Sequence, residues 1–201
     1  MSGPNLELLR TDIRALKSAA LAFSGGVDSS LLAYVATQEL GVSNFTAVTM
    51  NSPLLDAHDL EDAIRFCKVH GISHVVLDMD ILTNDDFVAN SKDRCYFCKQ
   101  EIFARIRDYA DAHNLTHVMD GTNGDDSPGR RPGMRVLCEK KIRSPLRECS
   151  FSKADIRAAS KDLKLATWNK MSDSCLATRV PQGVTITPES LQQANNEPSN
   201  S

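Results

Sequence analysis

The sequence predicts an α/β fold: a doubly wound, mostly parallel sheet with helices on both faces. Three observations support this prediction. Short apolar runs alternate along the chain with stretches whose apolar residues recur at helical spacing. The two kinds of segment follow one another at intervals typical of strand–helix–strand units, which build parallel sheets. The 201 residues, 41% hydrophobic and 24% charged, are enough for one globular domain with a core.

The expected elements can be assigned in order along the chain. An amphipathic helix over 5–17 opens it, because apolar residues share one helical face there. The apolar run 19–23 ends at two glycines, which is typical of a buried strand leading into a loop. The next helix should end before Gly41, since glycine is common just beyond a helix C-terminus. The alternation then continues with the strand 45–50, the helix 57–70 closed by Gly71, the strand 74–79, a helix around 102–109 and the strand 116–119.

The last third of the chain is less regular. The stretch 120–133 is rich in turn-forming and charged residues, so we expect a loop. Ser152, followed three residues later by Asp155, resembles a capping box and predicts a further helix. We expect one domain over 1–187 and a polar tail without fixed structure over 188–201, because the tail has little to bury.

Charge and cysteine content narrow the functional classes. A net charge of −3 gives no basic footprint for nucleic acid, so an RNA or DNA partner is not expected. We find neither a secretory signal nor an apolar run long enough to cross a bilayer, and expect a cytoplasmic protein. In that compartment the six cysteines should be reduced, so their spacing is interpreted first as metal binding or catalysis.

The segment LAFSGGVDSSLL places two glycines and three serines between an expected strand and an expected helix. Glycines allow backbone N–H groups to approach an anion, and a helix N-terminus adds partial positive charge. No Gly-Lys-Ser/Thr follows, so this is not a Walker A loop. The alternative is a strand–turn–helix junction with chance serines. The expected phosphate-binding residues are Ser24, Gly25, Gly26, Val27, Asp28, Ser29 and Ser30.

This loop resembles the SGGxDS signature of the PP-loop ATP pyrophosphatases, which cleave ATP between the α and β phosphates. The resemblance implies that the loop grips pyrophosphate and leaves the α-phosphorus open to attack by a substrate oxygen. The product would be an adenylate, which a nitrogen or sulfur nucleophile then attacks. Asp28 suits such a loop if a divalent metal lies between it and phosphate, or if it caps the helix.

The cysteine spacing bears on the nucleophile. Cys95 and Cys98 form a C-x-x-C just before the helix expected around 102–109, and Cys175 stands alone. A structural zinc normally takes four ligands, and we find no second pair of ligand residues. Three cysteines would suit a [4Fe–4S] cluster with one open iron, although C-x-x-C is also compatible with packing residues. The remaining three cysteines, expected to be small core residues, are Cys67, Cys138 and Cys149.

The chain from about 21 to 187 resembles the LarE family of the PP-loop superfamily. The motifs occur in the family's order: SGGVDSSLL, AVTMNSP, NSKDRCYFCKQEIF, DGTNGDD, RRPG, IRSPL and WNK…SCLATRVPQG. LarE proteins are ATP-dependent sulfur transferases that make the organic part of the nickel-pincer cofactor. With ATP and magnesium they adenylylate a carboxylate of a pyridinium dicarboxylate mononucleotide and convert it to a thiocarboxylate.

The resemblance implies two possible sulfur sources. In one subset of the family, a cysteine matching Cys175 donates its own sulfur and becomes dehydroalanine. In another subset, that cysteine and a C-x-x-C hold a [4Fe–4S] cluster with a replaceable sulfide. All three positions are cysteines here, which favours the cluster form.

Further site residues follow from the resemblance and from expected strand ends. Thr49 and Met50 end the second strand and would lie beside adenine. Asp125 and Asp126 could hold magnesium, unless they only form a turn. The expected ligands at the end of the fourth strand are Gly121, Thr122 and Asn123. The arginines that match family motifs, and could equally be surface or structural residues, are Arg94, Arg131, Arg143 and Arg179. The residues expected in catalysis are Cys175, Asp28 and Arg179.

Three other functions remain open at this point. A PP-loop tRNA thiolation enzyme could also carry three cysteines, but the acidic charge disfavours it. An amide-forming ligase that uses ammonia would leave the C-x-x-C unexplained. A nucleotide-binding relative without catalysis is the third. LarE proteins usually continue well past the CLATR motif, which leaves substrate-phosphate recognition and the expected homo-oligomer contacts open.

Overall fold

The computed structural model describes residues 4–126, 132–171 and 175–196. In these ranges a single parallel sheet of four strands has the order β3-β2-β1-β4. The strands are β1 (Ala19–Ala22), β2 (Phe45–Asn51), β3 (His74–Asp78) and β4 (His117–Met119). Their positions agree with the four predicted strands to within two residues.

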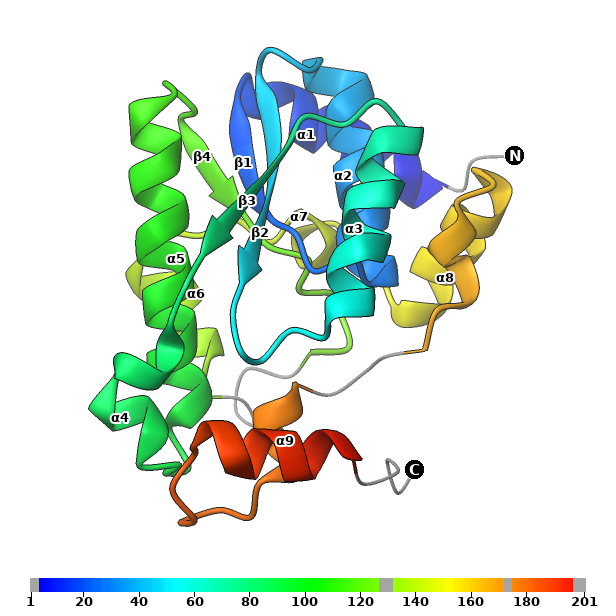
Figure 1. Ribbon diagram of the computed structural model, residues 1–201. Coiled ribbons are helices and arrows are strands. Elements are labelled where there is room, and N and C mark those ends of the chain that lie inside the picture. Colours follow the sequence, from blue (N-terminus) through cyan, green and yellow to red (C-terminus); the bar gives the residue numbers. More distant parts are fainter. Residues whose placement is uncertain (1–3, 127–131, 172–174, 197–201) are drawn as a thin grey trace.

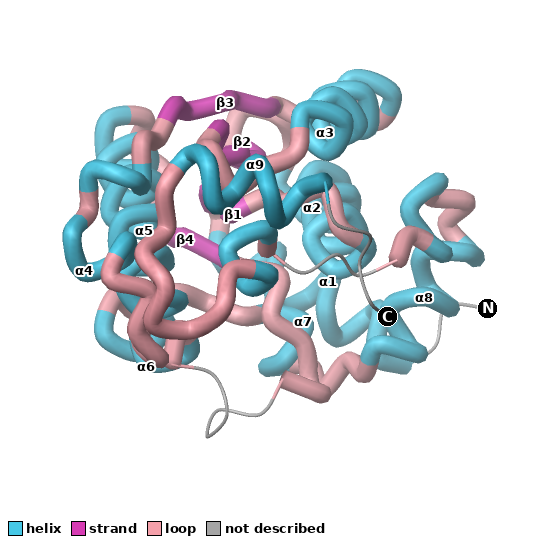
Figure 2. The backbone as a smooth tube through the Cα atoms, turned by 60° about the horizontal axis from the view of Figure 1, so that its bottom comes forward, coloured by secondary structure: helices cyan, strands magenta, loops and turns pink. Residues whose placement is uncertain are grey.

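Helices cover both faces of this sheet, as Figures 1 and 2 show together. The α1, α2, α3 and α8 helices lie on one side, and α5 and α6 lie on the other. The α-helices are α1 (Pro4–Leu16), α2 (Val27–Leu40), α3 (Ala57–Val69), α4 (Asp85–Val88), α5 (Arg94–Ala112), α6 (Met134–Glu139), α7 (Pro145–Glu148), α8 (Lys153–Asp162) and α9 (Pro188–Asn196). The 3₁₀ helices are η1 (Ile81–Thr83), η3 (Ala166–Asn169) and η4 (Leu176–Arg179).

The alternation of side chains along β1 explains why both faces are covered. Ala19 and Leu21 belong to the core cluster that includes Leu31 of α2, whereas Ala20 belongs to the cluster that includes Ile106 of α5. Successive residues of a strand point to opposite faces, and all of these are buried, so the strand needs a helix layer on each side. The predicted doubly wound α/β fold is confirmed.

Two helix boundaries bear directly on the predicted site. The capping box at the start of α8 is confirmed, because the Ser152 side chain accepts from Asp155 N while the Asp155 side chain accepts from Ser152 N. The α5 helix, by contrast, begins at Arg94. Cys95 and Cys98 therefore lie within its first turns, and the prediction that they precede the helix was wrong. Helical spacing continues back to Arg94 because Phe97 and Cys98 pack against a third core cluster.

The third cluster lies beyond the carboxyl ends of the strands and includes residues of η1, α4, η4 and α9. Its buried members are Met79, Ile81, Phe87, Ala177, Val180, Ile186, Leu191 and Ala194. The expectation of an unstructured tail from residue 188 is wrong for residues 188–196, which form α9. Leu191 and Ala194 are three residues apart and so share the face that α9 buries. Residues 197–201 lie outside the described ranges.

Candidate active site

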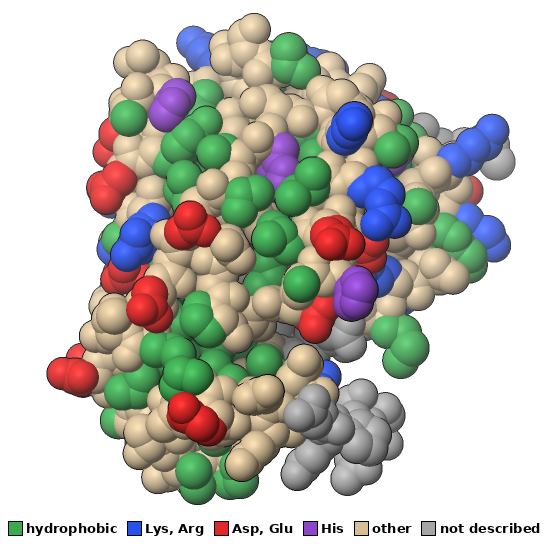
Figure 3. Space-filling view, viewed as in Figure 1, with side chains coloured by type: hydrophobic (Ala, Val, Ile, Leu, Met, Phe, Trp, Pro, Cys, Tyr) green, Lys and Arg blue, Asp and Glu red, His purple; other side chains and the backbone are tan. Residues whose placement is uncertain are grey.

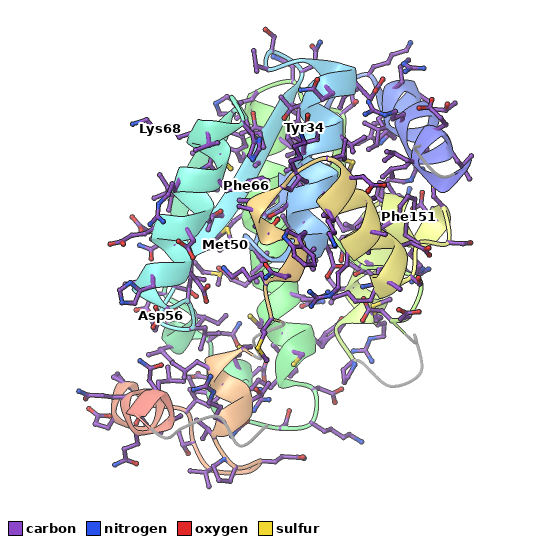
Figure 4. The ribbon with its side chains drawn as sticks, turned by 90° about the vertical axis from the view of Figure 1, so that its right-hand side faces the viewer. Tyr34, Met50, Asp56, Phe66, Lys68 and Phe151 are labelled. Carbon is purple, nitrogen blue, oxygen red and sulfur yellow. The ribbon has the colours of Figure 1, made fainter. Side chains whose placement is uncertain are left out.

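A cavity of about 530 Å³ opens at the carboxyl ends of β1 and β2. Ligand crevices of parallel α/β sheets form at this edge, and the volume is in the range of small-molecule sites. The phosphate loop lines one end of the cavity, and the start of α5 lines the other. Figure 4 shows Met50 at the end of β2, above Asp56 at the start of α3.

The phosphate loop is held in place by its own serines. Ser24 N–H donates to Ser29 Oγ over 3.3 Å, and Ser29 Oγ in turn donates to the Gly26 carbonyl over 3.1 Å. Gly25 has φ +71°, and a Cβ there would lie 3.2 Å from Ala63 Cβ. Glycine is therefore required on both conformational and steric grounds. The loop leads into the N-terminus of α2, a 14-residue helix, where an anion is favoured.

The predicted loop residues divide into two groups. Those that line the cavity are Ser24, Gly26, Val27 and Asp28. Gly25, Ser29 and Ser30 support the loop from behind. Ser30 is fully buried, and its hydroxyl has no hydrogen-bond partner among the described residues.

Asp28 forms an ion pair that sequence analysis did not predict. Lys153 Nζ, at the start of α8, lies 2.5 Å from Asp28 Oδ2, and Asn123 Nδ2 donates to Asp28 Oδ1 over 3.4 Å. Lys153 also lines the cavity. The capping box located the start of α8, but no local pattern showed that Lys153 would face the phosphate loop.

The acidic turn after β4 anchors α8. Asp125 Oδ2 accepts from Lys153 N over 2.7 Å, and Asp126 Oδ2 accepts from Asn123 N over 3.1 Å. Neither carboxylate lines the cavity. These contacts are the turn chemistry that was the alternative interpretation, and they give the two residues a positioning role.

The other predicted residues at the strand ends shape the cavity wall. Thr49 and Met50 line it. The Thr49 hydroxyl donates to the Phe23 carbonyl over 3.0 Å and lies 2.8 Å from His74 Nε2, so its polar capacity is used within the protein. At Gly121 a Cβ would lie 3.1 Å from Ser29 N, so this glycine allows the end of β4 to approach the phosphate loop.

Thr122 and Asn123 are buried beside that loop rather than in the cavity. Thr122 Oγ1 donates to Asp120 Oδ2 over 2.5 Å, and Asn123 Oδ1 accepts from Asp125 N over 2.9 Å. Both side chains therefore hold the segment after β4 in shape.

Three thiols meet at the opposite end of the cavity. Cys95 and Cys98 come from α5, and Cys175 stands just before η4; all three line the cavity. Burial, together with the neighbouring Cys175 and Cys95, raises the pKa of the Cys98 thiol to about 12. Burial also raises the pKa of Cys175, while a hydrogen bond from the Ala177 backbone lowers it. The fold thus unites cysteines that are about eighty residues apart in sequence.

The donor set at this end suits an iron–sulfur cluster in chemical type, since three thiols converge on one cavity. Within residues 4–126, 132–171 and 175–196, however, no three Cys, His, Asp or Glu side chains stand in a ready-made ligand arrangement.

The four predicted arginines lie in different surroundings. Arg94 lines the cavity, and its guanidinium donates to Asn90 Oδ1. Arg143, also predicted as a ligand, does not line the cavity, and its guanidinium pairs with Asp12 of α1 over 2.9 Å and with Glu148. These carboxylates raise the pKa of Arg143. Arg179 donates to the Ala194 carbonyl over 3.3 Å and does not line the cavity. Arg131 lies outside the described residues.

The lysines of the cavity were not predicted from the sequence. Besides Lys153, the wall contains Lys99, 3.8 Å from Asp120 Oδ2, and Lys170, 2.9 Å from Asp59 Oδ1. Each is thus paired with a carboxylate. Their positions beside the cysteine motif and in the WNK motif were the available signals.

Comparisons with known proteins identify the family of this chain. Residues 8–125, more than half of the chain, match the family model of NAD synthase. An uncharacterized protein of Synechocystis sp. is 42% identical over 188 residues, which span 94% of this chain and 70% of that protein. The pyridinium-3,5-bisthiocarboxylic acid mononucleotide synthase of Lactiplantibacillus plantarum is 33% identical over 181 residues, or 90% of this chain and 66% of that protein. The chain belongs to the LarE family of the PP-loop superfamily.

A solved structure supports the fold of this LarE-family chain. The NH3-dependent NAD synthetase of Campylobacter jejuni superposes with a TM-score of 0.62 at 19% identity, over 96% of this chain and 90% of that one. The chain spans about two thirds of the length of the two sequence relatives. Within the described ranges, no helix is both long and apolar enough to span a membrane.

Proposed function

We propose that this LarE-family chain is an ATP-dependent sulfur transferase. It would adenylylate a carboxylate of a pyridinium dicarboxylate mononucleotide and replace AMP with sulfur, in nickel-pincer cofactor biosynthesis. One observation carries the proposal: a single cavity has a phosphate loop at one end and three thiols at the other. The named activity of the Lactiplantibacillus plantarum relative supports the choice of substrate.

The cavity provides for the two chemical steps at its two ends. A carboxylate oxygen of the substrate attacks the α-phosphorus of ATP, and pyrophosphate leaves into the loop of Ser24, Gly26 and the α2 N-terminus. Lys153 and Lys170 supply positive charge there. A sulfur nucleophile then attacks the carbonyl carbon of the acyl adenylate, and AMP departs with the bonding electron pair.

Magnesium would be held at the phosphate end. Asp28 and Asp59 are the carboxylates that line the described cavity, and oxygen ligands are what magnesium takes. Magnesium would neutralise charge on the phosphates of ATP. Asp28 would exchange its Lys153 partner for the ion, which frees the Lys153 ammonium to bind a phosphate oxygen.

For the sulfur source we propose a [4Fe–4S] cluster held by Cys95, Cys98 and Cys175. Two of these lie at i and i+3 on α5, so they occupy one side of the helix. Such a cluster, with one open iron, supplies a replaceable sulfide. The alternative is that Cys175 donates its own sulfur. Both sources require Cys175, which lines the cavity.

The cellular setting belongs to the same proposal. Cytoplasmic conditions would keep the thiols reduced, and a small mononucleotide fits the cavity volume. The net charge is −3, and the face in Figure 3 interleaves acidic, basic and apolar side chains. Nucleic-acid binding normally requires a basic patch, so we propose that the protein has no nucleic-acid partner. We also propose a homo-oligomer.

The decisive experiment combines turnover with metal analysis. Anaerobically purified protein is incubated with ATP, magnesium and the pyridinium substrate, and pyrophosphate and thiocarboxylate are measured. The cluster source predicts about four irons per chain and sulfide loss on turnover. The sacrificial source predicts a mass loss of hydrogen sulfide at Cys175.

Variants separate the proposal from its rivals. Cys175→Ala should release pyrophosphate but form no thiocarboxylate, while Cys138→Ala, which alters an exposed cysteine outside the cavity, should behave as wild type. Thiolation by Cys175→Ala would rule out both sulfur sources. Incorporation of nitrogen when ammonia is supplied would instead favour the amide-forming ligase, the alternative that uses ammonia.

A further inference from the structure

Asn90 occupies an unusual position between α4 and α5. It is fully buried (0% exposed) and has φ +51°. Asparagine is among the few non-glycine residues that tolerate this left-handed conformation. A buried amide must find partners for two donors and one acceptor, so its contacts show what the position is built to hold.

The amide of Asn90 is fully used, and its partners lie on two distant segments. Nδ2 donates to the Pro181 and Val184 carbonyls, each over 2.8 Å. Oδ1 accepts from the Arg94 guanidinium. One side chain thereby joins the first residue of α5 to the turn that follows η4.

Backbone hydrogen bonds reinforce the same junction. Gly183 N donates to the Asn90 carbonyl over 3.1 Å, and Ile186 N donates to the Val88 carbonyl over 2.9 Å. The segment 181–186 is thus fastened along residues 88–90.

The junction is close in sequence to all three thiols. Asn90 precedes Cys95 by five residues, and Pro181 follows Cys175 by six. Between Cys175 and Pro181, η4 buries Ala177 in the third core cluster. The position of Cys175 relative to α5 therefore depends on how the 181–184 turn is attached.

We propose that Asn90 is a positioning residue for the sulfur-transfer end of the cavity. It fixes the Arg94 guanidinium at the cavity wall and holds the Cys175 segment against the start of α5. This inference rests on the proposed function only for the chemistry of the thiols. The clamp itself is a property of the protein before any ligand binds.

Two variants separate the parts of the clamp. Asn90→Gly removes all three side-chain hydrogen bonds but keeps a residue that accepts positive φ. Asn90→Asp has nearly the same volume and can still accept a hydrogen bond from Arg94. It lacks both N–H donors, however, and places a carboxylate oxygen against the Pro181 and Val184 carbonyls. Asn84→Ala is the matched control: Asn84 Oδ1 accepts from Phe87 N and caps α4, so the variant weakens the same region without touching the clamp.

The readout is thiol cross-linking in the full chain without ATP, substrate or iron. A short reagent with two thiol-reactive arms is added, and peptide mass spectrometry measures the Cys175–Cys95 link relative to the Cys95–Cys98 link. The second link lies within α5 and serves as an internal reference. ATP affinity is measured in parallel, because the phosphate end should not respond.

We expect the Cys175–Cys95 ratio to fall about tenfold in both Asn90 variants, because each loses two buried hydrogen bonds to the 181–184 turn. ATP affinity should change less than about twofold, and Asn84→Ala should keep the wild-type ratio. If Asn90→Gly does not fold, Asn90→Asp carries the test. An unchanged ratio in the folded variants, or an equal fall in Asn84→Ala, would overturn the proposal. Neither result depends on thiolation, so failure of the proposed function would be seen separately.

Discussion

Asp28 and Lys153 show how single residues set the charge of the phosphate end. A carboxylate beside a phosphate site is unfavourable unless a cation stands with it. The Lys153 ammonium, 2.5 Å from Asp28 Oδ2, fills that role in the structure. Both side chains line the cavity and remain partly accessible, so an incoming ATP–magnesium complex can exchange with the pair.

Lys153→Met should weaken ATP binding about tenfold or more, because a charge-assisted contact with phosphate contributes about 1.5–3 kcal/mol. Isothermal titration with ATP and magnesium measures the change. Lys161→Met is the control, since Lys161 is on the same helix but stands over the Trp168 ring. Equal affinities for Lys153→Met and wild type would exclude Lys153 from the phosphate site.

Buried thiols should make the protein less stable at alkaline pH. Burial raises the pKa of Cys67 from 9.0 to about 12, so the folded state keeps a proton that the unfolded state loses between these values. The unfolded state then binds fewer protons, and the free energy of unfolding falls as pH rises from about 9 to about 12. Cys67 alone should contribute a loss of about 1.4 kcal/mol at pH 10.

Urea unfolding at pH 8 and pH 10 tests this linkage. Cys67→Ala should lose less stability than wild type over that interval, by about the same 1.4 kcal/mol. Cys138→Ala, whose native side chain is exposed, is the control and should follow wild type. Identical pH dependence in wild type and Cys67→Ala would contradict the raised pKa.

At the scale of elements, the contact between the phosphate loop and α3 depends on one glycine. Gly25→Ala should lower the free energy of unfolding by more than about 1 kcal/mol, from φ +71° strain and from the 3.2 Å approach to Ala63 Cβ. ATP affinity should fall as well, because the loop backbone must move. Gly71→Ala is matched: φ is +63°, but nothing lies within 4 Å of the added Cβ. It should show the strain alone and bind ATP normally. Equal effects on ATP affinity would mean that the loop tolerates the shift.

The strands and the long helices were predictable from sequence, and the shortest helices were not. The four strands stand out as short apolar runs, and the long helices carry enough apolar residues to show their period. The α4 and α7 helices have four residues each, too few for a period, and depend on contacts made elsewhere. The α9 helix was not predicted because Leu191 and Ala194 become buried only when they pack against residues from distant segments in the third cluster.

Within the site, too, some residues were predictable from the sequence and others were not. The phosphate loop is a contiguous motif, so its residues were identified directly, and the three cysteines were united through the family resemblance. Ion pairs were not predictable. Asp28 and Lys153 are 125 residues apart, and Arg143 and Asp12 are 131 apart. Which carboxylate a basic side chain contacts is decided by tertiary structure, so neither the Lys153 pair with Asp28 nor the Arg143 pair with Asp12 could be predicted.

At the scale of the whole molecule, the cavity lies between the sheet with its helix layers and the third core cluster. The sheet with its two helix layers supplies the phosphate end, and the third cluster, at the bottom of Figure 1, supports the segment with Cys175. Residues of α9 complete that cluster and accept a hydrogen bond from Arg179. The thiol end should therefore depend on a helix that itself contributes no residue to the cavity wall.

A chain ending at Thr187, the predicted domain boundary, tests this dependence. It loses the burial of Leu191 and Ala194 and the acceptor of Arg179, so the free energy of unfolding should fall by about 2–4 kcal/mol. The Cys175–Cys95 cross-link should weaken with it, while ATP affinity stays near wild type. In the full chain, Leu191→Asp should reproduce these effects, and Gln192→Asp, on the exposed face of α9, should not. A chain ending at Thr187 that unfolds at the wild-type urea midpoint would show that α9 is dispensable, and the domain would then end where sequence analysis placed it.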